Sequence, residues 1–302
     1  MNALLKSLLP PIDFGWNHVR ARCGLTDCHN KLLMRPVPMK SAGIRIGQDW
    51  YCSVDCFVTA ARSPLAALLA RRVMEMPRNP RLSLGLALLS KGSLTEKQLR
   101  MATELSRENG EDLETTLVAL GWANEKQLAV ARSAQWGYPV LSQERAGRAV
   151  EVGIPLALLR TFSAAPVFYS ASTNRLVLGF VERVDHRLLQ SVEQVAGYRA
   201  EPCFLTQAEF AEQMRRVAHP AMYEEVVMDT PMDPSQMART LGRCALDASA
   251  TDVGFVQCKS WVWARLMGKR RTVDVLFAKE SAAAAPVTAD SRFTQAMAGA
   301  RG

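Results

Sequence analysis

The 302-residue chain lacks long apolar runs: no stretch approaches the roughly 18–20 consecutive apolar residues that a membrane-spanning helix needs. We therefore expect no insertion into a membrane. Residues 1–11 carry one lysine and a few leucines, but Pro10-Pro11 ends the run, so they do not resemble a secretory signal. The expected location is the cytoplasm, where thiols stay reduced.

Catalytic motifs are missing as well. The sequence has no Gly-x-x-x-x-Gly-Lys-Ser/Thr phosphate loop, no nucleophile elbow and no His-Glu-x-x-His motif. The four histidines lie in four separate places, and the polar triplet Asp185-His186-Arg187 opens a helix for which Asp185 is the expected N-cap. The sequence therefore predicts a protein that is not an enzyme.

Basic residues exceed acidic ones by eight, which gives a pI of about 9.3. Such an excess can attract a polyanionic partner, for example nucleic acid, a membrane face or a nucleotide. The basic residues are scattered, however, and only Lys269-Arg270-Arg271 forms a run. We therefore expect most of this charge to keep the protein soluble. We do not expect nucleic acid to be its partner.

Shifts in composition divide the chain into five segments of an α+β multi-domain protein. The apolar fraction of 48% is enough for buried cores. We expect a small zinc-stabilised module over 15–75, a helical-hairpin repeat over 78–145, a small α/β subdomain over 146–220, a short C-terminal α/β piece over 221–279, and a disordered, Ala-rich tail over 280–302.

Four of the seven cysteines form two pairs, Cys23 with Cys28 and Cys52 with Cys56, and 23 residues separate the pairs. In a cytosolic chain such spacing predicts a tetrahedral zinc site rather than disulfides. Four protein ligands leave no open position, so the zinc would be structural. The alternative is four ordinary buried thiols, and the remaining three cysteines, Cys203, Cys244 and Cys258, are expected to pack in cores.

The surroundings of the second pair favour the zinc interpretation. Residues 47–53 resemble a hairpin strand that runs into a turn, and Cys56 opens an apolar-periodic helix whose N-terminus stabilises a thiolate. This arrangement resembles treble-clef zinc modules, although their first pair usually has two intervening residues and here it has four. His18 or His29 could each replace one thiolate.

The tetrapeptide Glu-Lys-Gln-Leu occurs twice, at 96–99 and 125–128, inside one local pattern with a period of 29 residues. A fixed period indicates one supersecondary unit used twice. Each copy has a glycine that can end a helix and a capping box that can begin the next. These residues are Gly92, Thr95 and Gln98 in the first copy, and Gly121, Asn124 and Gln127 in the second. The pattern predicts two packed helical hairpins.

The repeat resembles the N-terminal domain of type II secretion and type IV pilus assembly ATPases (general secretion pathway protein E-like). In that domain a motif like Arg-Leu-Gly-x-x-Leu-Val-x-x-Gly-x-Ile-Thr-x-x-Gln-Leu recurs twice and closes with a Gln. The resemblance covers about 81–217. The matching residues are Leu84, Gly85, Leu88, Leu89, Gly92, Leu94, Thr95, Gln98 and Leu99 in the first copy, and Leu113, Leu117, Val118, Gly121, Leu128 and Gln135 in the second.

Some members of this family bind cyclic di-GMP through the repeat, so the resemblance implies a candidate ligand site. Two leading arginines of the motif are missing here, since Ser83 and Asp112 stand in their places. Each lost charge-assisted phosphate contact removes about 1.5–3 kcal/mol. The implied ligand residues are Leu84, Gly85, Leu88, Leu89, Gly92, Leu113, Leu117, Val118, Gly121 and Gln135.

The last structured segment resembles the start of the next domain of these ATPases. We expect a helix over 237–246 and strands over 248–255, 261–268 and 273–277. Without a phosphate loop, ATP hydrolysis by the family's mechanism is not available.

The expected function is therefore a non-catalytic cytoplasmic adaptor or regulatory protein that docks on a protein partner of a secretion or pilus-type assembly. One alternative is a cyclic di-GMP sensor that uses the repeat. Another is a zinc-dependent nucleic-acid binder that uses the basic surface and the run at 269–271.

Overall fold

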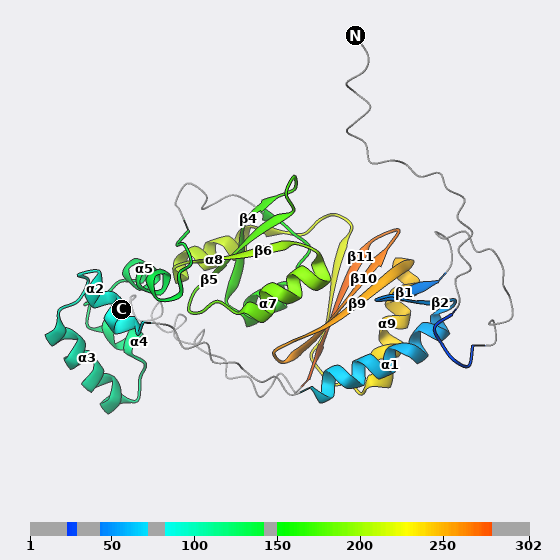
Figure 1. Ribbon diagram of the computed structural model, residues 1–302, viewed down its shortest axis with the longest axis horizontal. Helices are drawn as coiled ribbons and strands as arrows, with labels where there is room; N and C mark the ends of the chain where they lie inside the picture. Colours follow the sequence, from blue (N-terminus) through cyan, green and yellow to red (C-terminus); the bar gives the residue numbers. More distant parts are fainter. Residues whose placement is uncertain (1–22, 29–42, 72–81, 142–149, 280–302) are drawn as a thin grey trace, which may run out of the picture.

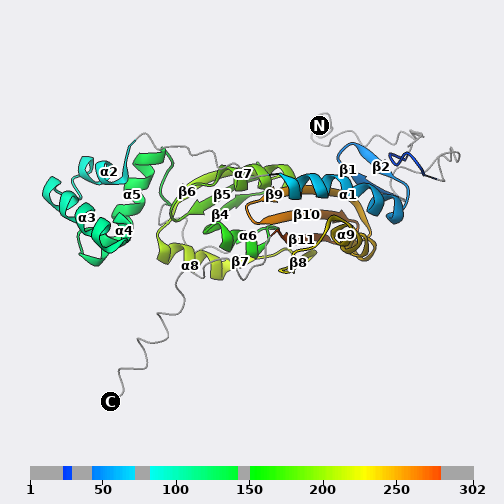
Figure 2. The same ribbon diagram turned by 90° about the horizontal axis from the view of Figure 1, so that it is seen from below.

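The computed structural model describes residues 23–28, 43–71, 82–141 and 150–279. The expected disordered tail, 280–302, and the alternative zinc ligands His18 and His29 lie outside these residues. Within the described residues, no helix is long and apolar enough to cross a membrane. Three parts follow one another along the molecule in both views: the helical repeat, an α/β subdomain, and a large sheet with two helices (Figures 1 and 2).

The helical repeat consists of two helical hairpins, as the sequence predicts. Its helices are α2 (Leu84–Ser90), α3 (Glu96–Asn109), α4 (Leu113–Ala119) and α5 (Glu125–Trp136). Gly92 and Gly121 both have φ +67, and this left-handed conformation ends α2 and α4 at little cost because glycine has no Cβ. The main-chain bonds repeat too: Ser93 N–H donates to the oxygen of Leu88, and Trp122 N–H donates to that of Leu117.

Capping boxes begin the second helix of each hairpin. In α3, Gln98 N–H donates to Thr95 Oγ1 (3.3 Å) and Thr95 N–H donates to Gln98 Oε1 (2.9 Å). In α5, Asn124 and Gln127 exchange the same two bonds at 2.9 Å. The two copies thus share their helix starts and stops, which are local features of the sequence.

The α/β subdomain contains a three-stranded sheet of order β4-β5-β6. Strands β4 and β5 are antiparallel, whereas β5 and β6 are parallel and joined through a helix. This agrees with the small α/β subdomain that the sequence predicts after the repeat. The elements are β3 (Val150–Glu151), α6 (Leu156–Thr161), β4 (Ala164–Ser170), β5 (Arg175–Phe180), α7 (His186–Ser191), the π-helical turn η2 (Val192–Ala196), β6 (Arg199–Phe204), α8 (Gln207–Arg216) and β7 (Val217–Ala218).

The third part is a six-stranded sheet of order β2-β1-β9-β10-β11-β8, which combines segments from both ends of the described chain. The sequence suggested separate pieces over 15–75 and 221–279, but β1 pairs in parallel with β9, with Arg45 opposite Asp252 and Ile46 opposite Val253. The elements are β1 (Ile44–Ile46), β2 (Asp49–Tyr51), α1 (Val54–Ala70), β8 (Tyr223–Met228), α9 (Pro234–Ala248), β9 (Ala250–Cys258), β10 (Trp261–Gly268) and β11 (Thr272–Ala278).

Helices α1 and α9 cover one face of this sheet (Figure 1). Phe57 and Leu65 of α1 and Leu241 of α9 are fully buried against alternate residues of β10 and β11. The two helices approach closely at Gly242, where an added Cβ would lie 2.5 Å from a methyl group of Val58. Residues 43–71 and 221–279 therefore share one hydrophobic core.

The opposite face packs against the α/β subdomain. Trp263 of β10 and Leu276 of β11 are fully buried in the core that contains Phe180 and Phe204. Between the two bodies, Arg265 pairs with the buried Asp274 and also donates to the oxygen of Gly153. Because a charge can be buried only with good partners, this network fixes how the sheet meets the subdomain.

Candidate functional site

The four cysteines of the predicted zinc site lie together. Their sulfur atoms are all within 4.8 Å of one another. Cys28 and Cys52 are separated by 3.5 Å, and each lies 3.7 Å from Cys56. A tetrahedral zinc site with Zn–S bonds of about 2.3 Å places its sulfurs roughly 3.8 Å apart. The donor set and its spacing therefore fit a structural zinc ion.

Local structure holds these cysteines in place. Cys56 lies in the first turn of α1, where Ser53 is the N-cap and its Oγ accepts from Cys56 N–H at 3.2 Å. Gly24 N–H donates to the oxygen of Trp50 at 2.8 Å, which ties the first pair to the hairpin. Burial raises the pKa of the Cys56 thiol, so a metal ion must displace its proton on binding.

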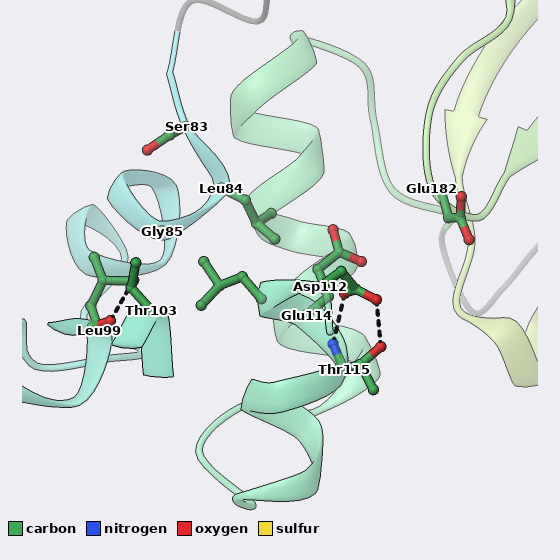
Figure 3. A pocket seen from close by; sticks show the side chains of 10 residues that line it. Ser83, Leu84, Gly85, Leu99, Thr103, Asp112, Glu114, Thr115 and Glu182 are labelled. Carbon is green, nitrogen blue, oxygen red and sulfur yellow. Dashed lines mark hydrogen bonds between the residues drawn. The ribbon is translucent and has the colours of Figure 1, made fainter. Parts of the chain in front are cut away.

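A pocket of about 660 Å³ lies where the two halves of the repeat meet the α/β subdomain (Figure 3). Its walls come from the starts of α2 and α4, from one face of α3, and from the loop after β5. The lining residues are Ser83, Leu84, Gly85, Leu99, Thr103, Asp112, Leu113, Glu114, Thr115 and Glu182. Leu84 and Leu113 occupy equivalent positions in the two copies, so both copies contribute the start of their first helix to the pocket.

Only part of the candidate nucleotide site faces this pocket. Leu84, Gly85 and Leu113 line it. Leu88 and Leu117 are fully buried in the core of the repeat, where they pack against Leu128 and Ala131 among others. The remaining candidates, Leu89, Gly92, Val118, Gly121 and Gln135, are not among the lining residues. The buried leucines cannot stack on a base unless the repeat opens.

Carboxylates supply the charge of the pocket lining that the structure describes. Asp112, Glu114 and Glu182 all contribute, and among the described residues no lysine or arginine lines the pocket. Hydrogen bonds from the hydroxyl (2.7 Å) and N–H (2.9 Å) of Thr115 lower the pKa of Asp112, so its carboxylate stays ionised at neutral pH. This lining disfavours an anionic phosphate.

Arg132 is the residue that the sequence did not single out. It is 6% exposed, pairs with Glu114, and donates to the oxygen of Val181 at 2.7 Å. Glu114 takes the place that Gly85 has in the first copy, and Arg132 the place of Thr103, since both pairs are offset by 29 residues. The sequence did hold a signal for this pair. At the two positions where the first copy has uncharged Gly85 and Thr103, the second copy has an acid and a base.

The excess of positive over negative charge lies outside the described residues. These carry 24 lysines and arginines and 24 acidic residues, so the whole excess of eight falls in the other segments. Arg271 of the basic run pairs with Glu224. The described part therefore carries no net positive charge that would attract nucleic acid.

Comparisons with known proteins find similarity over about half of the chain. No protein-family model matches the chain. The type IV pilus assembly ATPase PilB of Thermus thermophilus is 27% identical over 154 residues, which are 50% of this chain and 17% of that protein. A solved structure of MshE with cdg is 25% identical, with a TM-score of 0.37, and covers 45% of this chain and 99% of that one. The N-terminal domain of XpsE is 24% identical, with a TM-score of 0.34, and covers 45% and 93%.

The resemblance to this family of assembly ATPases, which the sequence suggested, is confirmed by the similarity to the type IV pilus assembly ATPase PilB. The similar region of PilB is less than a fifth of that ATPase. The similarity to PilB is therefore limited to one region of that ATPase.

Proposed function

We propose that this chain is a non-catalytic, cytoplasmic adaptor or regulatory protein that docks on a protein partner of a secretion or pilus-type assembly. The supporting observation is the exposed apolar surface of the helical repeat. Of the nine exposed large apolar side chains among the described residues, five lie there: Leu86, Met101, Val118, Leu120 and Val130. Met101 and Val130 are equivalent residues of the two copies. Exposed apolar residues that gather on one part of a protein favour a protein-binding role.

Site-specific photo-cross-linking in the native cell tests this proposal. A photoreactive phenylalanine analogue would replace Met101 or Val130 in the full chain, and Leu246 in a control, because Leu246 is exposed and apolar but lies on α9. Adducts with a secretion or pilus component from positions 101 and 130, and not from 246, would support docking through the repeat. Absence of such adducts, or equal adducts from all three positions, would contradict it.

A cyclic di-GMP sensor is the second candidate. In its favour, the pocket contains Leu84, Gly85 and Leu113 of the implied ligand residues, and MshE is described with cdg. Against it stand the three carboxylates of the lining, which has no lysine or arginine among the residues that the structure describes. Calorimetric titration of cyclic di-GMP into the full chain separates the two candidates: saturable binding at micromolar concentration supports the sensor, and no heat at high concentration excludes it.

We propose further that Cys23, Cys28, Cys52 and Cys56 hold one structural zinc ion. Metal analysis of the purified chain should find one zinc per molecule. Replacing Cys52 with Ser should reduce that content strongly, since a hydroxyl is a poor zinc ligand compared with a thiolate. Cys203→Ser is the matched control, because Cys203 is buried outside the cluster and its loss should leave the zinc content unchanged.

A further inference from the structure

The two most exposed large apolar side chains among the described residues lie at one end of the six-stranded sheet. Met222, just before β8, is 61% exposed, and Leu246, near the end of α9, is 63% exposed. Both segments adjoin the turn between β10 and β11. Thr272 N–H donates to the oxygen of Met222 at 2.8 Å. Lys269 N–H donates to the oxygen of Ser249, the C-cap of α9, at 3.3 Å. This end of the sheet points away from the helical repeat (Figure 1).

Packing holds this end of the sheet in a fixed shape. Ser249 ends α9 in the left-handed conformation, with φ +53. Gly268 lies so close to the helix end that an added Cβ would be 2.1 Å from the main-chain oxygen of Ala248. Ala245 and Ala248 are buried in the core of the sheet, which leaves Leu246 on the solvent side of α9. The exposure of Leu246 is therefore a property of the packed fold.

The same end is locally basic. Lys269 and Arg270 of the turn are exposed, and neither forms an ion pair within the part of the chain that the structure describes. Arg243, near the end of α9, is exposed as well. Asp247 opposes one of these charges, so cations prevail here although the described residues are balanced as a whole. The only basic run of the chain thus lies beside its most exposed apolar side chains.

One kind of partner satisfies both sets of side chains. At the surface of an anionic membrane, apolar side chains reach the boundary of the acyl chains while lysine and arginine stay with the lipid phosphates. Nucleic acid would satisfy the cations but leave the apolar side chains in water. The side chains are long and flexible, which suits a fluid interface that offers no matching pocket. They are here named the basic–apolar end: Met222, Arg243, Leu246, Lys269 and Arg270.

We propose that the basic–apolar end contacts the anionic surface of a lipid membrane. It is a surface contact, in which Met222 and Leu246 enter the headgroup boundary and the cations pair with lipid phosphates. This goes beyond the docking proposed for the helical repeat. The two surfaces lie at different ends of the molecule (Figure 1), so the repeat remains free for a protein partner.

Co-sedimentation of the full chain with vesicles tests the charged part of this contact. Wild type should bind vesicles of phosphatidylcholine with phosphatidylglycerol more tightly than vesicles of phosphatidylcholine alone, and salt should weaken that binding. Lys269→Gln with Arg270→Gln should weaken it about thirtyfold, because each cation near an anionic surface contributes about fivefold. Lys97→Gln with Arg100→Gln is the matched control, since both residues are exposed on α3 and the change in charge is the same.

The apolar part is tested by Met222→Ser with Leu246→Ser. This variant should bind the same vesicles about tenfold or more weakly, with the salt dependence of wild type, because it keeps every cation. In hydrogen exchange, phosphatidylglycerol vesicles should slow exchange in peptides covering 243–249 and 268–272 of the wild-type chain. Peptides covering α3 and α5 of the repeat should not change.

Three outcomes would overturn the proposal. The first is that wild type binds neither kind of vesicle. The second is equal weakening by the variant at 269 and 270 and by its control, which would assign vesicle binding to charges elsewhere in the chain. The third is that the variant at 269 and 270 loses binding to a DNA duplex but keeps its binding to vesicles. None of these outcomes affects the cross-linking test of the repeat, so the two proposals fail separately.

Discussion

The guanidinium of Arg132 donates to the main-chain oxygen of Val181 at 2.7 Å, and it also pairs with Glu114. Arg132 and Glu114 belong to the second copy of the helical repeat, whereas Val181 follows β5 of the α/β subdomain. The first copy has Thr103 and Gly85 in the corresponding places. The two copies thus share their folding signals but not this contact, and the second copy alone uses it to join the subdomain.

Replacing Arg132 with Met should destabilise the protein by about 2–3 kcal/mol, because Glu114 loses its cation and the buried oxygen of Val181 loses its donor. Urea unfolding of the full chain measures the loss. Arg100→Met on the exposed face of α3 is the matched control and should change stability by less than about 0.5 kcal/mol. Equal stability of the two variants would show that the buried pair contributes nothing net.

Replacing the N-cap Thr95 with Ala should cost about 1 kcal/mol, since α3 then loses the acceptor for Gln98 N–H. Asn124→Ala should cost a similar amount, because α5 begins with the same capping box. Thermal and urea unfolding give both values. Thr95→Ser keeps the hydroxyl and should remain close to wild type; a serine variant as unstable as the alanine variant would refute the capping explanation.

Replacing Gly268 with Ala should destabilise the sheet by about 2 kcal/mol or more, because its Cβ would lie 2.1 Å from the main-chain oxygen of Ala248 and a backbone must move to relieve the clash. Gly254→Ala in β9 is the control: no heavy atom lies within 4 Å of an added Cβ there. We expect that variant to be as stable as wild type or slightly more stable, by urea unfolding. The reverse order of stabilities would contradict this packing.

The N-cap Asp112 should make part of the stability depend on pH. Hydrogen bonds from Thr115 lower its pKa below the ordinary value of 3.8. A lowered pKa contributes stability above the unfolded value, and that contribution is lost as the pH falls through the folded value. Asp112→Asn should therefore be less stable than wild type at pH 7, with the difference shrinking towards pH 3. Unfolding curves across this range that stay parallel would contradict the assignment.

If the acidic lining is what prevents nucleotide binding, reversing it should create binding. The variant Ser83→Arg, Asp112→Arg restores the two leading arginines of the motif and keeps Glu114 as the partner of Arg132. It should bind cyclic di-GMP at least tenfold more tightly than wild type by calorimetry, since each charge-assisted contact is worth about 1.5–3 kcal/mol. A variant that folds, by circular dichroism, and still shows no binding would mean that the buried leucines, not the charges, close the site.

The helix starts and stops of the repeat could be predicted from the sequence because they depend on near neighbours. Gly92 and Gly121 need only the preceding turn, and each capping box needs only residues three positions apart. The four cysteines could also be grouped, because their spacing alone is typical of zinc ligands. The repeat also pointed to the family resemblance that the comparisons support.

The pairing of the early strand β1 with the late strand β9 could not be predicted in the same way. The pairing of Ile46 with Val253 involves a three-residue strand and a partner more than two hundred residues away, and no local pattern encodes such a contact. Arg132 was missed for a related reason: one arginine on a helix usually lies in solvent. The burial of Leu88 and Leu117 likewise depends on how the hairpins pack, so a motif match could not assign them to core or ligand.

The pairing of β1 with β9 also sets an order of events during synthesis. Residues 44–46 leave the ribosome roughly 200 residues before their partner strand does, which is about 10–40 s at the usual rate of about 5–20 residues per second. During that interval the repeat and the α/β subdomain can fold while the early hairpin has no sheet to join. The core side chains of residues 43–71 therefore stay exposed until residues 250–279 have been made, and their burial reports that the six-stranded sheet has formed.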